Sequence, residues 1–344
     1  MSTTRIKAWP ILLFATALVF CTTGHAQQKR GISLEPTSQS APSLFGGGVY
    51  RALVIGNQRY ADPSGYWKSL DTPIQDARAI RRVLRESYGF QDVRLLENAT
   101  RRDMLLALHD LGKRVQASDN VLIYYAGHGF LDPDTERGYW VPVDARGTDH
   151  TTFLRNSTIR DELSIVSGRA QHTLLISDSC FSGTLLRSPS RGMASNISSE
   201  RYYRQVASKK SVQILSAGGI EYVDDDYNSS GHSPFTYFLL SALSNNQQDV
   251  LVTSELAADV TEAVANNVDQ IPQSGVLQGA GDELGEFIFL KVDVQVEGVA
   301  PERVKVQVNV VPKTPEAESG TPEASGESQI SDTPTRVIAP MPTL

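Results

Sequence analysis

Four short apolar runs divide the central part of this chain of 344 residues. Each is rich in Val, Ile, Leu or Tyr and is bounded by polar or glycine residues, which is typical of strands buried on both faces. The runs are Val49–Gly56, Asn120–Ala126, His172–Asp178 and Ser211–Ala217. Segments with apolar residues at helical spacing separate them. This alternation predicts an α/β fold, with a mostly parallel central sheet of about six strands flanked by helices.

The remaining elements are expected from the same periodicity and from turn residues. We expect helices at Pro73–Tyr88, Arg101–Val115, Ile159–Val166, Ser233–Leu243 and Ser254–Val268. We expect further strands at Val93–Leu96, Tyr139–Val143 and Glu286–Leu290. The stretch 184–209 is rich in Ser and Arg and poor in large aliphatic side chains, which favours an exposed loop.

The first 26 residues have the three parts of an export signal. Arg5 and Lys7 are positively charged, Pro10–Cys21 is apolar, and Ala26 is the small residue that a signal peptidase requires. We expect cleavage after Ala26, a periplasmic or secreted protein, and no stable membrane insertion after cleavage. An uncleaved N-terminal anchor is the alternative.

Three flanking segments differ in composition from the α/β region. Residues 27–48 are polar and end in three glycines, which is typical of a flexible lead-in. Residues 291–311 alternate between apolar and polar side chains around a Gly and a Pro, and this favours a β-hairpin. Residues 312–344 are mostly polar and rich in Pro, Glu, Ser and Thr, so they predict a disordered tail.

The composition excludes several classes of protein. Hydrophobic residues make up 40% and charged residues 21%, which is ordinary for a globular chain. No apolar run reaches the roughly 18 residues of a membrane-spanning helix, so the chain is not a polytopic membrane protein. The formal net charge of −7, with no basic block, argues against nucleic acid as a partner.

Export would leave the chain with a single cysteine. Cys21 lies in the expected signal, so Cys180 is the only thiol of the mature chain and no disulfide can form within it. Exported domains usually use their cysteines in pairs. The thiol of Cys180 is therefore either buried and incidental or present for its reactivity.

Chemically useful residues follow two of the expected strands. Asn120–Ala126 leads into Gly127-His128-Gly129, and His172–Asp178 leads into Ser179-Cys180. The carboxyl ends of parallel strands lie at one edge of the sheet, so His128 and Cys180 can meet there. An imidazole beside a thiol helps to form the thiolate nucleophile. The main-chain N–H groups of Gly129 and Cys180 could then form an oxyanion hole.

These motifs resemble those of caspase-like cysteine peptidases, and among them metacaspases and their bacterial relatives. The resemblance covers about residues 49–290 and is carried by Ala52–Tyr60, Asp76-Ala77, Tyr124–Gly129, Val141–Asp144, Ser177–Gly183, Ser233–Ala242 and Gln270–Phe289. The Gln-Ala-Cys signature of caspases is absent, and Asp178-Ser179-Cys180 stands in its place. The resemblance implies a caspase-like fold and a cysteine-type endopeptidase that acts on polypeptides, with Cys180 as the nucleophile and His128 as its base.

The resemblance also implies how a substrate is held. Metacaspases use acidic residues to bind a P1 Arg or Lys, and the pattern maps these acids onto Asp76 and Asp178, where two carboxylates would suit a guanidinium. A peptide would add as an extended strand beside the segment around Ser216-Ala217-Gly218-Gly219. The alternatives are structural roles, with Asp178 bound by backbone N–H groups and Asp76 as a first-turn helix acid.

The resemblance bears on self-cleavage and metals as well. The loop 184–209 corresponds to the family's linker, and its basic residues would let an enzyme with a basic P1 preference cut itself there, with a merely solvated loop as the alternative. Many metacaspases need calcium, and Asp144 and Asp161 match two of the acidic ligands. Arg187 stands where calcium-dependent members have an acid, and a cation disfavours Ca²⁺. We expect no metal site and no cofactor.

Two other functions stay open. The chain could be a catalytically weak binding or signalling module that keeps the fold. It could also be the same kind of peptidase with a different P1 preference, such as Asp or Asn. The oligomeric state and the physiological substrate are not predicted.

Overall fold

The computed structural model describes residues 48–179, 185, 200–218, 227–277 and 279–292. The expected signal peptide, the lead-in up to residue 47, Cys180, and the hairpin and tail beyond residue 292 lie outside the described residues. Among the helices that are described, none combines the length and the apolar character that crossing a membrane requires.

A six-stranded sheet forms the centre of the described fold and confirms the predicted α/β class. Its strands run in the order β10, β8, β7, β3, β1, β2, and all pair in parallel except β10, which is antiparallel to β8. The strands are β1 (Tyr50–Gly56), β2 (Asp92–Glu97), β3 (Asn120–Ala126), β7 (His172–Asp178), β8 (Ser211–Ser216) and β10 (Gln273–Val276). The four apolar runs of the sequence are β1, β3, β7 and β8, which are contiguous because strands covered on both faces belong in the middle.

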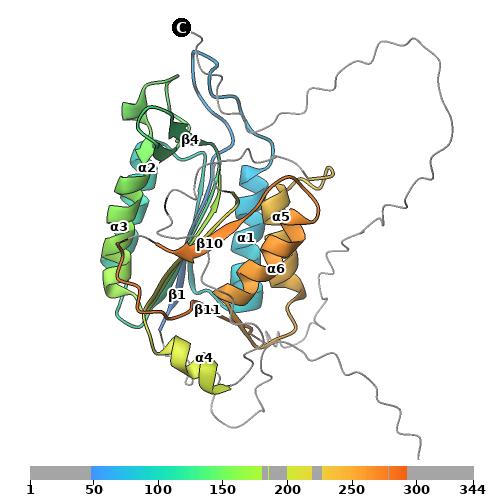
Figure 1. Cartoon of the computed structure of the whole chain (residues 1–344). Helices are drawn as coiled ribbons and strands as arrows, with labels where there is room; N and C mark the ends of the chain where they lie inside the picture. Colours follow the sequence, from blue (N-terminus) through green and yellow to red (C-terminus); the bar gives the residue numbers. More distant parts are fainter. Residues whose placement is uncertain (1–47, 180–184, 186–199, 219–226, 278, 293–344) are drawn as a thin grey trace, which may run out of the picture. The chain divides into compact units, whose positions relative to one another are not determined.

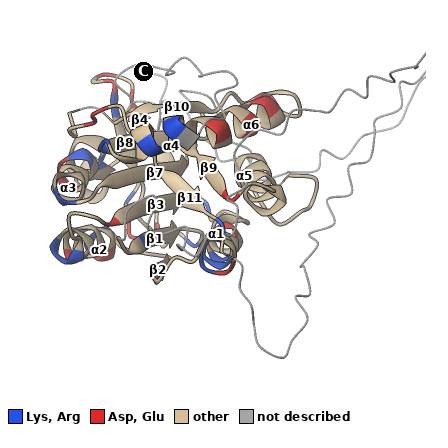
Figure 2. Ribbon diagram, turned by 90° about the horizontal axis from the view of Figure 1, so that it is seen from below, with Lys and Arg blue, Asp and Glu red and all other residues tan. Residues whose placement is uncertain are grey.

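Helices cover both faces of this sheet (Figures 1 and 2). Helices α2 (Arg101–Arg114) and α3 (Asn156–Arg169) lie on one face, and α1 (Pro73–Tyr88), α5 (Pro234–Asn245) and α6 (Thr253–Ala265) lie on the other. Each helix packs an apolar stripe against the strands, and this makes two cores, one on each side. The ends of α2 and α1 follow local signals: a capping box of Thr100 and Asp103 starts α2, and left-handed Gly89 ends α1.

Short strands form two smaller sheets. Strands β4 (Gly129–Asp132), β5 (Arg137–Trp140) and β6 (Leu154–Arg155) make one. A short 3₁₀ turn at His150–Thr152 lies between β5 and β6. Strands β9 (Val250–Val252) and β11 (Ile288–Leu290) make the other. The expected strand Glu286–Leu290 is therefore shorter and pairs outside the central sheet. The sixth central strand is β10, whose sequence Gln-Ser-Gly-Val contains no apolar run from which a strand could be predicted.

Helix α4 (Glu200–Ala207) lies within the stretch for which the sequence predicts an exposed loop. Tyr203, Val206 and Ala207 are buried at helical spacing and join the core that includes α5 and α6. The expectation is wrong for these residues because tertiary packing of three apolar side chains fixes a helix that the polar composition alone does not indicate.

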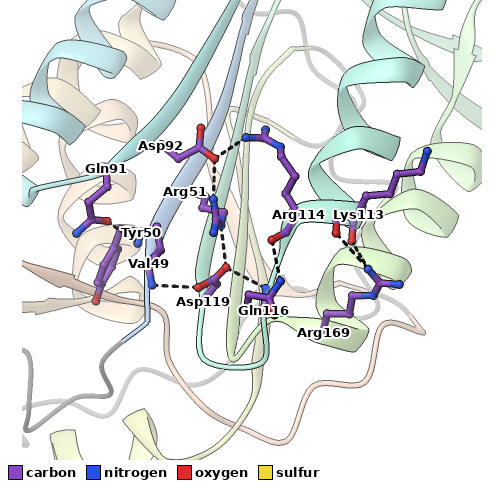
Figure 3. Close-up of polar contacts among 11 residues, drawn as sticks. Val49, Tyr50, Arg51, Gln91, Asp92, Lys113, Arg114, Gln116, Asp119 and Arg169 are labelled. Carbon is purple, nitrogen blue, oxygen red and sulfur yellow. Dashed lines mark hydrogen bonds and ion pairs between the residues drawn. The ribbon is translucent and has the colours of Figure 1, made fainter.

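Charged side chains tie together the amino-terminal ends of β1, β2 and β3, at the end of the sheet opposite the site described below (Figure 3). Asp119 is buried, and its carboxylate accepts from Arg51 Nε at 2.7 Å and from Val49 N at 3.0 Å. Arg51 also donates to Asp92 at 2.8 Å, and Arg114 contacts the same oxygen of Asp92 at 2.6 Å. This cluster connects the starts of three strands, whereas the candidate site residues follow the opposite, carboxyl ends of β3 and β7.

Candidate active site

The register of β3 and β7 brings two sequence motifs to one edge of the sheet. Ala126 and Asp178, the last residues of the two strands, are direct partners. Gly127 N donates to the Asp178 carbonyl oxygen at 3.3 Å, so the pairing continues one residue beyond β3. His128 follows Ala126 by two positions, and Cys180 follows Asp178 by two positions. The structure describes the chain that leads to Cys180 as far as Ser179, which is buried.

Gly127 makes the turn from β3 to His128. Its φ is 155°, and a Cβ built there would lie 2.8 Å from the Tyr125 hydroxyl oxygen and 3.0 Å from that of Tyr60. No other residue fits without moving these groups, because real Cβ contacts are essentially never that short. The glycine before His128 is therefore required by close packing.

His128 is only 4% exposed and is held by the loop 58–70. Its backbone N–H donates to the Tyr60 hydroxyl at 2.8 Å, and its Nε2 lies 2.8 Å from the carbonyl oxygen of Lys68. A carbonyl oxygen can only accept, so Nε2 is the nitrogen that carries a proton. The rings of Tyr60 and Trp67 pack against the imidazole with centroids 4.7 and 5.4 Å away. These contacts fix both the ring and its tautomer.

Gly129, the residue expected to help bind an oxyanion, is the first residue of β4 and is buried. It lies opposite Trp140 in the β4–β5 register. The carbonyl of His128 accepts from Val141 N at 3.0 Å. The main chain on both sides of the His128–Gly129 peptide is thus held by the small sheet, which gives its N–H groups fixed directions.

The two acids expected to recognise a basic P1 side chain lie close together, joined by Ser233. Asp76, in the first turn of α1, and Asp178, at the end of β7, are both fully buried. The Ser233 hydroxyl donates a very short hydrogen bond to Asp178 Oδ2, and Ser233 N lies 3.5 Å from Asp76 Oδ2. Thr236 Oγ1 donates to Asp178 Oδ2 at 2.8 Å, and His232 Nδ1 donates to Asp76 Oδ1 at 2.7 Å.

This acidic pair thus has polar partners from the start of α5. Asp178 accepts from two hydroxyl groups, whereas Asp76 faces an imidazole whose side chain is 24% exposed. Side chains of the 232–236 segment and the backbone N–H of Ser233 thus contact both acids, and Asp76 also lies in the first turn of α1.

Ser216 and Ala217, the first two residues of the segment beside which we expect a peptide to pair, lie at the end of β8 in the central sheet. Ser216 ends β8, which has β7 on one side and β10 on the other. Ala217 N donates to the Ser177 carbonyl at 2.9 Å, and the Ala217 carbonyl accepts from Gln270 Nε2 at 2.7 Å. Because these main-chain groups are already used, an added strand would have to begin at Gly218 or beyond, and residues 219–226 lie outside the described ranges.

Asp144 and Asp161, the two residues matched to calcium ligands, both belong to the described part of the chain. Asp144 Oδ1 accepts from Arg101 N at 2.8 Å, at the start of α2, and Asp161 lies within α3. Arg187 lies outside the described residues. Among the described residues, no three carboxylate, imidazole or thiol groups are placed to share a metal ion.

Sequence reasoning missed His232, Ser233 and the Lys68 carbonyl as parts of this site. Ser233 is recognisable as a helix N-cap before Pro234, and its hydroxyl does accept from Thr236 N at 3.0 Å. No sequence signal shows that the same hydroxyl reaches Asp178. A backbone carbonyl such as that of Lys68 has no sequence signature at all.

Comparison with known proteins agrees with this architecture. Residues 50–276 match the family model described as the caspase domain of peptidase family C14. The chain belongs to this family, which is the family predicted from its motifs.

Relatives among characterised proteins are metacaspases of fungi. Metacaspase-1 of Cryptococcus neoformans is 29% identical over 192 residues, which cover 47% of this chain and 38% of that protein. Metacaspase-1A of Aspergillus niger is 24% identical over 265 residues, covering 71% and 62%. The matches thus span less than two thirds of either relative. Together with the family match, they support a cysteine peptidase of family C14.

Two solved structures are also similar. Protein GSU0716 from Geobacter sulfurreducens is 22% identical, with a TM-score of 0.49, and the match covers 72% of this chain and 98% of that one. Caspase-1 from Spodoptera frugiperda is 14% identical, with a TM-score of 0.48 and coverages of 72% and 96%.

Proposed function

We propose that this protein is an exported cysteine endopeptidase that hydrolyses peptide bonds after Arg or Lys, with Cys180 as the nucleophile and His128 as its base. The observation that carries the proposal is the placement of His128. The imidazole of His128 is buried, lies two residues beyond the end of β3 and is held by the Lys68 carbonyl. The neighbouring strand β7 ends at the same edge of the sheet and continues into Ser179. Cys180 is the next residue of that segment.

The tautomer of His128 suits a general base. With Nε2 donating to the Lys68 carbonyl, the neutral imidazole has its lone pair on Nδ1. Nδ1 can therefore accept the thiol proton of Cys180. The Lys68 carbonyl also stabilises the imidazolium that results, because its oxygen accepts from the Nε2 proton more strongly when the ring is charged.

The reaction then proceeds in two halves. The Cys180 thiolate attacks the carbonyl carbon of the substrate, a C–S bond forms, and the oxyanion is bound by the N–H groups of Gly129 and Cys180. His128 gives its proton to the leaving amine as the C–N bond breaks, which leaves an acyl-enzyme. Water, deprotonated by His128, attacks the thioester, releases the carboxylic acid and restores the thiol.

The acidic pair of Asp76 and Asp178 supports a preference for a basic P1 side chain. Two carboxylates within reach of one Ser residue concentrate negative charge, and Asp178 is only two positions before Cys180. A guanidinium or ammonium group is the natural partner of such a pair. The peptide itself would pair by its main chain with the segment that begins at Gly218.

Export rests on the sequence of the first 26 residues, with their charged start, apolar centre and small residue at the end. Protein made from the full chain in a bacterial host should carry Gln27 at its N-terminus when it is recovered from the periplasm. A retained Met1 on membrane-bound protein would instead indicate the uncleaved anchor.

Active-site labelling tests the chemical assignment. Purified protein beginning at Gln27 is treated with a peptidyl acyloxymethyl ketone that ends in Arg, beside His128→Ala and Cys180→Ala. We expect Cys180 to be labelled within minutes in the natural protein and at least tenfold more slowly in His128→Ala. Equal labelling of the natural protein and His128→Ala would remove His128 from the mechanism. No labelling of a folded natural protein would favour a binding module without turnover.

A further inference from the structure

Three residues of the loop 58–70, Tyr60, Trp67 and Lys68, contact His128. The Tyr60 hydroxyl accepts from the backbone N–H of His128, the Lys68 carbonyl accepts from Nε2, and the Trp67 ring packs against the imidazole. Most of this loop is otherwise exposed, since Ala61, residues 63–65 and residues 68–69 all face solvent. Something within the loop must therefore hold its shape, because a free loop of this length would not fix a carbonyl to within hydrogen-bond distance.

Besides the backbone hydrogen bonds from Leu70 N to Gln58 O and from Ala61 N to Val143 O, both 2.9 Å long, the main group that holds it is Asp62. Its Oδ1 accepts from Ser64 N at 3.1 Å and from Gly147 N at 3.2 Å. Its Oδ2 accepts from Ser64 Oγ at 2.7 Å, Tyr66 N at 2.9 Å and Trp67 N at 3.1 Å. One carboxylate thus binds five donors, and four of them are backbone N–H groups or a hydroxyl in the five residues that lead to Lys68.

A second contact connects the loop 58–70 to Gly147. Trp67 Nε1 donates to the Gly147 carbonyl at 2.9 Å, while Gly147 N donates to Asp62. The Trp67 ring also packs on Phe130 and Phe153 with centroids 6.2 and 5.4 Å away. The backbone N–H of Trp67 is thus bound by Asp62, and its indole N–H is bound by Gly147. The next residue, Lys68, provides the carbonyl that contacts His128.

These hydrogen bonds stabilise the ionised form of the Asp62 carboxylate. Partial burial works to raise its pKa, but the hydrogen bonds from Ser64, Trp67 and Gly147 outweigh this and lower the pKa to about 2. The carboxylate is thus ionised throughout the pH range in which a peptidase works. The carboxylate binds its own loop and Gly147 rather than His128, and it has no proton to transfer.

We propose that Asp62 is a positioning residue for catalysis, which sets the orientation and tautomer of His128 by holding the carbonyl of Lys68 against Nε2. This inference rests on the proposed peptidase function for its kinetic consequence, but its structural consequence is independent of activity. Loss of the Asp62 clamp lets the Lys68 carbonyl move, and the imidazole then loses the partner that keeps its proton on Nε2.

The test uses Asp62→Asn in the chain beginning at Gln27. The amide keeps one acceptor oxygen, so it can serve either the two donors at Oδ1 or the three donors at Oδ2, and the other set loses its partner. We expect kcat on the preferred peptide to fall about tenfold to 100-fold with KM changed less than about threefold, and the acid limb of the pH–rate profile to shift. Asp134→Asn, at an exposed acid in the turn between β4 and β5, is the matched control and should change neither.

A second readout does not depend on turnover. In the Cys180→Ala background, imidazole ¹⁵N NMR should show His128 protonated on Nε2, and Asp62→Asn should convert part of it to the Nδ1–H form. Ser64→Ala, which removes one of the five donors, should give a smaller change in the same direction and guards against a failure of Asp62→Asn to fold. If Asp62→Asn lowers only the melting temperature, with the tautomer and the pH–rate profile unchanged, the clamp is structural and the proposal is wrong. If no variant has peptidase activity but the tautomer still shifts, the proposed function fails and the role of Asp62 stands.

Discussion

Asp76 and His232 are 156 residues apart in the chain and are joined by a 2.7 Å hydrogen bond between Asp76 Oδ1 and His232 Nδ1. Asp76 is fully buried, while the His232 side chain is 24% exposed. If Asp76 is the acid that binds a basic P1 side chain, the imidazole occupies the place that a guanidinium must take. His232 would then act as an internal competitor of the substrate.

This relationship gives a prediction on specificity. His232→Ala should raise kcat/KM for a peptide ending in Arg more than for the same peptide ending in citrulline, which is neutral but has nearly the same shape. Asp76→Asn should lower the Arg-to-citrulline ratio about tenfold or more, since a buried charge pair is lost. Glu86→Gln, at an exposed acid of α1, is the control. Equal effects on the two peptides would show that Asp76 and His232 have a structural role only.

Helix α4 narrows the expected sites of self-cleavage. A peptide bound by strand addition must be extended, and residues 200–207 are helical, so bonds after Arg201 and Arg204 are protected in the folded protein. We predict that any self-cleavage in the 184–209 stretch occurs outside this helix, after Arg187, Arg191 or Lys209. N-terminal sequencing and intact mass of the natural protein, with Cys180→Ala as the uncut control, would check this. A new N-terminus at Tyr202 or Gln205 would contradict it.

His172 predicts a loss of stability in acid. Burial lowers its pKa from 6.5 to about 4, although a bond to the Ala207 carbonyl works in the opposite direction. Its Nε2 lies 3.1 Å from that carbonyl and its Nδ1 lies 2.9 Å from Ser211 Oγ, so the neutral ring is satisfied on both sides.

The sign follows from the two protonation states. Above pH 6.5 the ring is neutral whether the chain is folded or not, and His172 gives no pH dependence. Between pH 6.5 and about 4 only the unfolded chain takes up the proton, so the free energy of unfolding falls by about 3 kcal/mol from this group. Urea titrations from pH 7.5 to 4 should show that His172→Gln flattens this slope, whereas His109→Gln, at a half-exposed ring, leaves it intact. An unchanged slope in His172→Gln would contradict the assignment.

The two ion pairs of Asp119 and Asp110 should differ strongly in their contribution to stability. Asp119 contacts Arg51 with side-chain exposures of 2% and 16%, and it also holds a backbone N–H. Asp110 contacts Arg94 at 3.6 Å with exposures of 50% and 38%. Asp119→Ala should lower the free energy of unfolding by about 3 kcal/mol, because it leaves buried groups without their partner. Asp110→Ala should change it by less than about 1 kcal/mol, and similar losses in both variants would contradict this.

The sequence was sufficient for the middle of the fold because the strands there are buried on both faces. Such strands must be continuous apolar runs, and β1, β3, β7 and β8 are recognisable on that ground alone. Strand β10 is not, since its Gln-Ser-Gly-Val sequence becomes a strand only through pairing with β8. Helix α4 was hidden for a similar reason: its helical state depends on burying Tyr203 and its neighbours against the core.

In the candidate site too, some residues could be predicted from the sequence and others could not. His128 is recognisable because it follows a predicted buried strand, whereas Asp76 and Asp178 were expected from the resemblance to metacaspases, and the structure brings these two acids together. Their partners were not predictable. His232 and Ser233 reach Asp76 across more than 150 residues, and Lys68 contributes a backbone carbonyl, for which its side chain gives no signal. Ala217, predicted as a pairing position, already has Ser177 and Gln270 as partners.

Peptide hydrolysis by the purified protein tests the central claim most directly. Protein beginning at Gln27 and its Cys180→Ala variant are assayed under reducing conditions, with and without Ca²⁺, on fluorogenic peptides ending in Arg, Lys, Asp and Asn. We predict cleavage after Arg and Lys, without a need for Ca²⁺, that is absent in Cys180→Ala. Cleavage only after Asp or Asn would keep the dyad and contradict the acidic pocket. No cleavage of any peptide by folded protein would contradict the proposed peptidase function.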